Sequence, residues 1–236
     1  GLAAFVAVKL IYFIVRKLDE KYVETGFRHG QTITACLVAL SHGTNDAQKT
    51  MGIITLTLIA VGLQPSGSGP QLWVIAVCGL AIALGTYMGG WRVIRTLGKG
   101  LTEIATPQGF AAEASSATTI LVSSHLGFAL STTQVCSGSI IGSGLGKKGG
   151  AIDWKVAARM LIAWLVTFPA AGVIGAAACA VAKINVWGTL AVAAIAVVAA
   201  LIIFRLSRRN PVNAMNVNEG SEVKVNAKVA TAAAAA

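Results

Sequence analysis

Charged residues are scarce in this chain. They make up only 12% of its 236 residues, whereas 55% of the residues are hydrophobic and the mean hydropathy is +0.72. A soluble domain carries roughly 25% charged residues, so this composition excludes a soluble domain and indicates a polytopic membrane protein.

Acidic residues are the scarcer of the two charged classes, with 9 Asp and Glu against 19 Lys and Arg. The net charge of +10 does not require nucleic acid as a partner, because membrane proteins collect basic residues in their cytoplasmic loops. Aromatic residues also do not alternate with the basic ones, as they do in proteins that bind single-stranded nucleic acid. We therefore expect membrane lipid, and not nucleic acid, around this chain.

Cysteine is rare as well, and its spacing excludes two kinds of framework. The four cysteines form no CxxC pair and lie within apolar runs, at Cys36, Cys78, Cys136 and Cys179. This pattern predicts small buried residues between helices and neither a disulfide framework nor a zinc site. We expect no bound metal and no cofactor. The chain begins inside an apolar run without the basic region or cleavage site of a signal peptide, and we expect it to be truncated.

Long apolar runs predict an all-α polytopic membrane domain over residues 1–209. The runs occupy residues 1–15, 31–63, 71–91, 157–181 and 184–204, and we expect about five transmembrane helices. As one straight helix, run 31–63 would be about 50 Å long, against a hydrocarbon core of about 30 Å. We therefore expect it to be broken or partly outside the membrane. Residues 210–236 show no apolar face and are predicted to form a disordered cytoplasmic tail.

Basic residues between the runs predict the topology. They cluster at residues 16–28, 92–99, 147–159 and 205–209, and by the positive-inside rule these four clusters and the C-terminus are cytoplasmic. Segment 109–145 leaves one cytoplasmic cluster and returns to another, but it is only marginally long enough for two helices of about 20 residues and a turn. We therefore predict a re-entrant helical hairpin, which a membrane tolerates where protein or water surrounds the backbone.

The tip of this hairpin carries three consecutive hydroxyl side chains, Ser131, Thr132 and Thr133. They precede a run that can form a half-helix and are predicted to occupy its N-cap, N1 and N2 positions. Free backbone N–H groups, hydroxyls and the positive end of the helix dipole together suit a tetrahedral oxyanion. The alternative is that the hydroxyls simply cap the helix. At a re-entrant tip, where unpartnered polar groups are costly, we favour anion binding.

A second polar stretch, residues 39–50, interrupts the run 31–63. Asn45 and Asp46 have the hard oxygen ligands of a cation site, or a carboxyl group that can carry a proton. A proton-relay role and a structural role remain equally open for His42. We expect Lys49 to pair with Asp46, with attraction of anions as the alternative.

Two further ionisable residues lie on the arms of the predicted hairpin, at Glu113 and His125. An intramembrane carboxylate is a functional candidate by default, so a coupling or gating role for Glu113 stands beside a structural one. We expect a structural role for His125. No residue is predicted to be catalytic.

Two motifs resemble those of the inorganic phosphate transporter family. The stretch ALSHGTNDAQKTMGIITL resembles the signature of the family's second repeat in the bacterial low-affinity branch, and GFALSTTQVCSGSIIGSGLG is similar to its hairpin motif. This resemblance implies two inverted repeats, each with a broken helix that contains Asn-Asp and a re-entrant hairpin that ends in Ser-Thr-Thr. It also implies phosphate contacts from Ser131, Thr132 and Thr133, and cation or proton coupling through Asn45 and Asp46.

The chain departs from the family pattern at two points. Gln134 stands where many members have a histidine, and because an amide does not titrate, a proton role of that histidine does not carry over. Gln134 is therefore grouped with His42, Lys49 and Glu113 as a candidate for coupling or gating. The chain also contains one Asn-Asp stretch and one Ser-Thr-Thr tip. The resemblance thus implies a C-terminal half that needs an N-terminal half, or a second copy, for a complete site.

The resemblance implies a symporter of the plasma membrane that moves inorganic phosphate. Gln-Lys after the Asn-Asp pair resembles the proton-coupled members that carry a neutral metal–phosphate complex, so H⁺ is favoured over Na⁺. A sodium-coupled phosphate permease and a sulfate permease of the same family are the alternatives. An intramembrane hydrolase is a distant one, because no Gly-x-Ser-x-Gly elbow is present.

Overall fold

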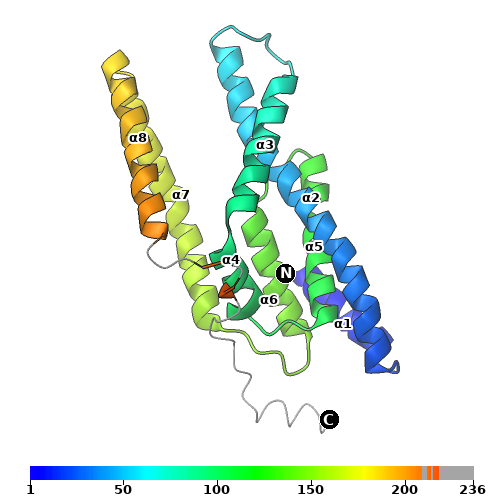
Figure 1. Ribbon diagram of the computed structural model, residues 1–236. Coiled ribbons are helices and arrows are strands. Elements are labelled where there is room, and N and C mark those ends of the chain that lie inside the picture. Colours follow the sequence, from blue (N-terminus) through cyan, green and yellow to red (C-terminus); the bar gives the residue numbers. More distant parts are fainter. Residues whose placement is uncertain (209–211, 214, 218–236) are drawn as a thin grey trace. The chain divides into compact units, whose positions relative to one another are not determined.

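The computed structural model describes residues 1–208, 212, 213 and 215–217, apart from the side chains of Glu20, Met88 and Ser207 (Figure 1). These residues form helices and no strand; an isolated β-bridge joins Thr102 to Ile152. The elements are α1 Leu2–Val15, α2 Glu20–Ala60, α3 Leu72–Met88, α4 Trp91–Arg95, π-helix η1 Thr96–Gly100, α5 Thr106–His125, α6 Thr132–Gly146, α7 Trp154–Ala182 and α8 Val186–Ser207. The chain divides into two compact units, Gly1–Ile152 and a second that begins at Asp153.

Helix α2 contradicts one of the two alternatives predicted for run 31–63, a broken helix, and leaves the other, a helix partly outside the membrane, as a prediction. It runs without interruption through the polar stretch for 41 residues, which is about 60 Å at ~1.5 Å per residue. The segment contains no proline to remove a helical hydrogen bond. The Ser41 hydroxyl donates to the Val38 carbonyl, and the Thr44 hydroxyl donates to the Leu40 carbonyl, so these polar side chains are accommodated within the helix itself. Asn45 and Asp46 therefore lie on a helix face and not at a helix end.

Helices α5 and α6 form the predicted helical hairpin and lie side by side in Figure 1. Helix α5 also contacts α1 and α2, and α6 contacts α1. The buried faces consist largely of small residues, which allow helix backbones to approach closely. On α5 they include Ala112, Ser116 and Ala117, and on α6 they include Ser137, Ser139 and Ser143. The hairpin is thus confirmed as a pair of helices, while its re-entry into the membrane stays a prediction.

The predicted span 71–91 is divided by a glycine pair. Helix α3 ends at Met88, and the chain turns at Gly89 and Gly90 before α4 begins. Gly90 has a φ angle of 96°, in the left-handed region that glycine adopts without a steric penalty. The axes on the two sides of this break differ by 59°. Trp91 therefore begins a short second helix and does not end a straight span.

The second unit contains the two plain apolar helices that the sequence predicts. Helices α7 and α8 are long and apolar enough to cross a membrane, and the most apolar 18-residue stretches of the two have mean hydropathies of 2.0 and 2.6. Almost none of either stretch is buried within the protein. If α3 and the bent segment after it form one span, the described residues contain three candidate spans. The prediction of about five spans is not confirmed.

The cysteines only partly match the prediction that they are buried. Cys78 is buried and Cys136 is half-buried, but Cys36 and Cys179 are exposed. Each is a free thiol. The error arises because an apolar run in a membrane protein faces lipid as readily as it faces other helices. Most of the predicted disordered tail, residues 210–236, lies outside the described residues.

Candidate functional site

The middle of α2 presents two rows of polar side chains to the tip of the α5–α6 hairpin. Residues four apart in a helix share one face, which aligns Ser41 with Asn45 and Lys49, and His42 with Asp46. Ser41 and Asn45 are almost fully buried, whereas His42, Asp46 and Lys49 are partly exposed. The site therefore has a buried floor of neutral groups and an accessible layer of ionisable ones.

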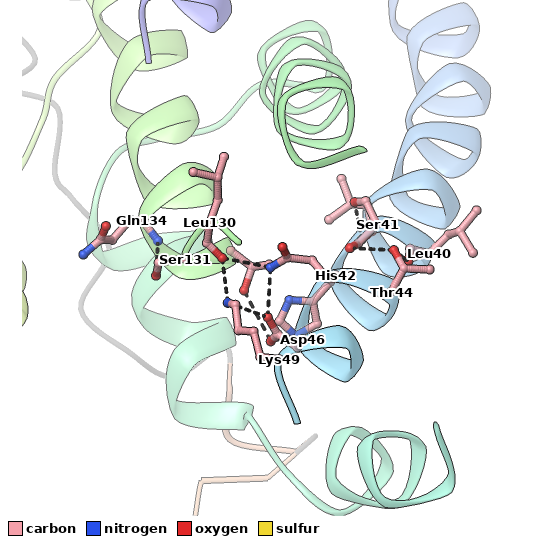
Figure 2. Close-up of polar contacts among 12 residues, drawn as sticks. Leu40, Ser41, His42, Thr44, Asp46, Lys49, Leu130, Ser131 and Gln134 are labelled. Carbon is pink, nitrogen blue, oxygen red and sulfur yellow. Dashed lines mark hydrogen bonds and ion pairs between the residues drawn. The ribbon is translucent and has the colours of Figure 1, made fainter. Parts of the chain in front are cut away.

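The backbone carbonyl of Leu130, directly before the N-cap of α6, accepts two hydrogen bonds from α2. The Asn45 side-chain amide donates to it at 2.8 Å. The Lys49 ammonium group donates to it at 2.6 Å (Figure 2). A carbonyl in a turn has no helical partner and must find its donors elsewhere. Here α2 supplies them, which fixes the hairpin tip against the polar stretch.

Asn45 connects the two arms of the hairpin to α2. Its side-chain oxygen accepts a hydrogen bond from the Ser124 hydroxyl on α5 at 3.3 Å, while its amide nitrogen donates to Leu130. The side chain is only 1% exposed, so the loss of either partner would leave a buried polar group unsatisfied. This arrangement assigns Asn45 a positioning role in the described structure. Its predicted role in cation coupling stays a prediction.

Asp46 is the electrostatic centre of the site. One carboxylate oxygen lies 3.4 Å from the Lys49 ammonium and accepts from the Asn45 amide at 3.2 Å. The other lies 3.5 Å from His42 Nε2 and 3.5 Å from the Thr132 hydroxyl. The predicted pairing of Lys49 with Asp46 is thus confirmed. The carboxylate is 34% exposed, so it remains accessible to a proton or a small ligand.

The N-terminus of α6 faces this carboxylate. Ser131 is the N-cap of α6. Its hydroxyl accepts a hydrogen bond from the Gln134 N–H group at 3.4 Å, and Figure 2 draws this contact as a dashed line. The prediction that Ser131, Thr132 and Thr133 occupy the N-cap, N1 and N2 positions is confirmed. Thr132 is buried against Asp46, whereas Thr133 and Gln134 are exposed. Their predicted roles in phosphate binding and gating stay predictions.

Glu113 belongs to a separate polar contact. Its carboxylate accepts a hydrogen bond from the Thr34 hydroxyl of α2 at 2.7 Å. Along α5 it is eleven residues from Ser124, or about 16 Å. Glu113 is therefore not part of the cluster around Asp46. His125 is the last residue of α5, and its side chain is exposed.

Sequence reasoning missed three participants in these contacts: Thr34, Ser124 and the Leu130 carbonyl. A backbone acceptor has no side-chain signature, so Leu130 could not have been found from residue types. Ser124 was detectable, because a buried Asn45 needs a second partner and a serine pair lies close to the predicted tip. Thr34 was detectable in the same way, from the need of Glu113 for a donor.

The fold and the site define a class: a helical membrane protein whose polar site lies between one long helix and the tip of a helical hairpin. Residues 3–175 match the phosphate transporter family. The chain belongs to that family.

Its relatives are named as transporters or permeases. The chain is 52% identical over 220 residues to a probable low-affinity inorganic phosphate transporter of Mycobacterium leprae, covering 92% of this chain and 53% of the relative. It is 39% identical over 179 residues to a protein of that name in Bacillus subtilis, covering 74% and 54%. These names support the prediction that the chain is not an enzyme. The chain spans about half the length of the curated relatives it matches.

The fold also resembles a solved structure, described as the sodium-dependent phosphate transporter. The two share 31% sequence identity and a TM-score of 0.56, with 67% of this chain and 42% of the other covered. The structural match thus agrees with the family match, since both are to proteins described as phosphate transporters.

Proposed function

We propose that this chain supplies half of the transport site of a symporter that moves inorganic phosphate across the plasma membrane, with a cytoplasmic C-terminus. The observation that carries the proposal is the position of the α6 N-terminus beside Lys49 and Asp46. Membership of the phosphate transporter family supports phosphate as the substrate.

Phosphate binds at the end of α6. Helix N-termini offer unpaired N–H groups and a partial positive charge, and these groups favour tetrahedral anions. The Thr133 hydroxyl is exposed there, and the Lys49 ammonium adds a full positive charge. Asp46 opposes a fully ionised anion, but a hydrogen bond from HPO₄²⁻ to its carboxylate stabilises phosphate where sulfate has no proton to donate. This difference favours phosphate over a sulfate permease.

The other half of the site comes from a segment outside this chain. About half of each matched relative has no counterpart here, and the inverted repeat that the motifs imply would place a second hairpin tip opposite Ser131–Thr133. Either that segment or a second copy of this chain completes the site.

Protons drive transport. The His42 Nε2 atom lies 3.5 Å from the Asp46 carboxylate, so these two side chains offer a proton a short path between an imidazole and a carboxylate. A sodium ion has no such path, since an imidazole passes on protons and not metal cations. A divalent metal enters as cargo in a neutral metal–phosphate complex.

The test is uptake of radiolabelled phosphate into proteoliposomes that contain either the chain alone or the chain with the part of the Mycobacterium leprae relative outside the matched region. We expect uptake in the second preparation, driven by an acidic exterior in the absence of Na⁺ and increased by Mg²⁺. Uptake by the chain alone would show that a second copy suffices. Failure of both preparations to take up phosphate would contradict the proposal.

Sodium coupling is the second candidate, because the similar solved structure is described as a sodium-dependent transporter. It predicts uptake that requires a Na⁺ gradient at equal pH on both sides and does not respond to a pH gradient. An excess of sulfate in the same assay separates the sulfate permease, since only that activity would show strong competition.

A further inference from the structure

A groove of about 900 Å³ lies between α1 and the turn after α6, away from the site around Asp46. Its volume is within the range of ligand-binding pockets. Four basic side chains line it: Lys9 and Arg16 from α1 and its C-cap, and Lys147 and Lys148 from the turn. The groove thus joins two of the basic clusters that the sequence places on the cytoplasmic side.

Among the described residues, no carboxylate neutralises the positive charge of the groove. No acidic residue lines it, and within the described part of the chain none of the four basic side chains forms an ion pair. Aromatic rings hold two of them instead. The Lys9 ammonium lies 4.6 Å from the centre of the Phe5 ring, and the Arg16 guanidinium lies 4.6 Å from the centre of the Phe13 ring.

The rest of the groove wall is apolar. Val6, Leu10 and Phe13 line it, and each side chain is more than half exposed. These residues lie along α1 before Arg16, over about 10 Å of helix. A free inorganic anion would need the basic end alone. A ligand that uses the whole groove must have an anionic head and a hydrocarbon chain.

We propose that this groove binds an anionic phospholipid of the cytoplasmic leaflet. The lipid phosphate lies against Arg16, Lys147 and Lys148, and an acyl chain follows the apolar wall of α1. Basic pockets between helices on the cytoplasmic side attract anionic headgroups in this way, and the unneutralised charge supplies the complementarity. The bound lipid ties α1 to the end of the α5–α6 hairpin. Lipid binding here does not depend on transport.

The test is native mass spectrometry of the purified chain in detergent, titrated with phosphatidylglycerol or with phosphatidylcholine. We expect a tight phosphatidylglycerol adduct and at most weak phosphatidylcholine binding. The double variant Lys147→Gln/Lys148→Gln should weaken phosphatidylglycerol binding by about 30-fold, because each basic residue near an anionic surface contributes about fivefold. Leu10→Ser should weaken binding of both lipids through the apolar wall.

The matched control is Lys17→Gln/Lys21→Gln, which removes two charges from exposed residues that do not line the groove. It should leave the adduct unchanged. An equal loss in the control, or equal affinity for the two lipids, would overturn the proposal, since either result indicates general attraction to charge or to micelles. Inorganic phosphate at roughly 10 mM is a large excess over the dissociation constant expected of a specific site. Displacement of the lipid under these conditions would show that the basic end binds free phosphate, and would also overturn the proposal. If the lysine variant does not purify as folded protein, Arg16→Gln tests the same headgroup contact.

Discussion

The α5–α6 pair and the α7–α8 pair are both helical hairpins, but their surfaces are opposite in character. Helices α5 and α6 bury serines, glycines and alanines against each other and against α1 and α2. Helices α7 and α8 are far more apolar, and they bury almost nothing within the protein. In a membrane, hydrophobic side chains gain nothing by leaving lipid, so close helix packing selects small residues and polar contacts. Of these two pairs, the more hydrophobic one is therefore the less buried.

The largest expected effect is the loss of phosphate uptake in Asp46→Asn, a change beside the tip of the α5–α6 hairpin. The substitution removes the negative charge shared by Lys49, His42 and the α6 N-terminus, so coupling has no carboxylate to protonate. We expect phosphate uptake to fall to background while the amount of protein in the membrane is unchanged. Uptake in proteoliposomes that transport with the native chain provides the measurement.

The control for Asp46→Asn is Thr167→Val on α7. The Thr167 hydroxyl donates to the Ala163 carbonyl of its own helix, and the residue is exposed. Uptake by this variant should equal that of the native chain. Normal uptake by Asp46→Asn would remove Asp46 from the coupling mechanism and leave it a structural partner of Lys49.

Glycine substitutions test the difference in helix packing directly. A Cβ atom added at Gly144 of α6 would lie 2.8 Å from the Thr102 hydroxyl, which donates to the Ala151 carbonyl. We expect Gly144→Ala to cost about 1–3 kcal/mol through overpacking. Gly175 of α7 has open space around it, so Gly175→Ala should be neutral or stabilising by up to about 1 kcal/mol. Thermal unfolding in detergent measures both variants. Equal changes in Tm would contradict the proposed difference in packing between α6 and α7.

Sequence patterns were sufficient to predict features that depend on neighbouring residues alone. The apolar runs located α7 and α8, and the Ser-Thr-Thr motif located the N-cap of α6 at Ser131. The pairing of Lys49 with Asp46, expected because the two are oppositely charged neighbours in one polar stretch, is also present. These features are local, so they do not depend on how distant segments meet.

Sequence patterns failed where the outcome depends on tertiary contacts. The length of run 31–63 predicted a helix that is broken or partly outside the membrane, and the break is not found. Helix α2 is continuous because hydroxyls bond within it and Leu130, Ser124 and Thr132 satisfy the remaining polar groups. Those partners lie about 80 residues further along the chain. The exposure of Cys36 and Cys179 could not be predicted either, because an apolar run does not show which face meets lipid.

Ligand-dependent stability separates anion binding at the hairpin tip from simple capping. Thr132→Val/Thr133→Val removes two hydroxyls beside the α6 N-terminus and leaves the Ser131 cap in place. Binding to the folded state stabilises a protein by about 2.7 kcal/mol at a ligand concentration of 100 Kd, and we expect this phosphate-dependent rise in Tm to disappear in the double variant. Thr119→Val, on an exposed face of α5, should retain it. A full shift in the double variant would return these threonines to a purely structural role.

The two hairpins also carry one matched feature, a side-chain N-cap on the second helix. Ser131 accepts from the Gln134 N–H group at the start of α6, and Asn185 accepts from the Gly188 N–H group at the start of α8. Ser131→Ala and Asn185→Ala should each cost about 0.5–2 kcal/mol, because each leaves a helix N–H group without its partner. Thermal unfolding with and without phosphate then distinguishes the caps. Only Ser131→Ala should reduce the phosphate-dependent rise in Tm, because the α6 N-terminus lies beside Lys49 and Asp46. An equal reduction in both variants would mean that phosphate stabilises the chain without binding at that helix end.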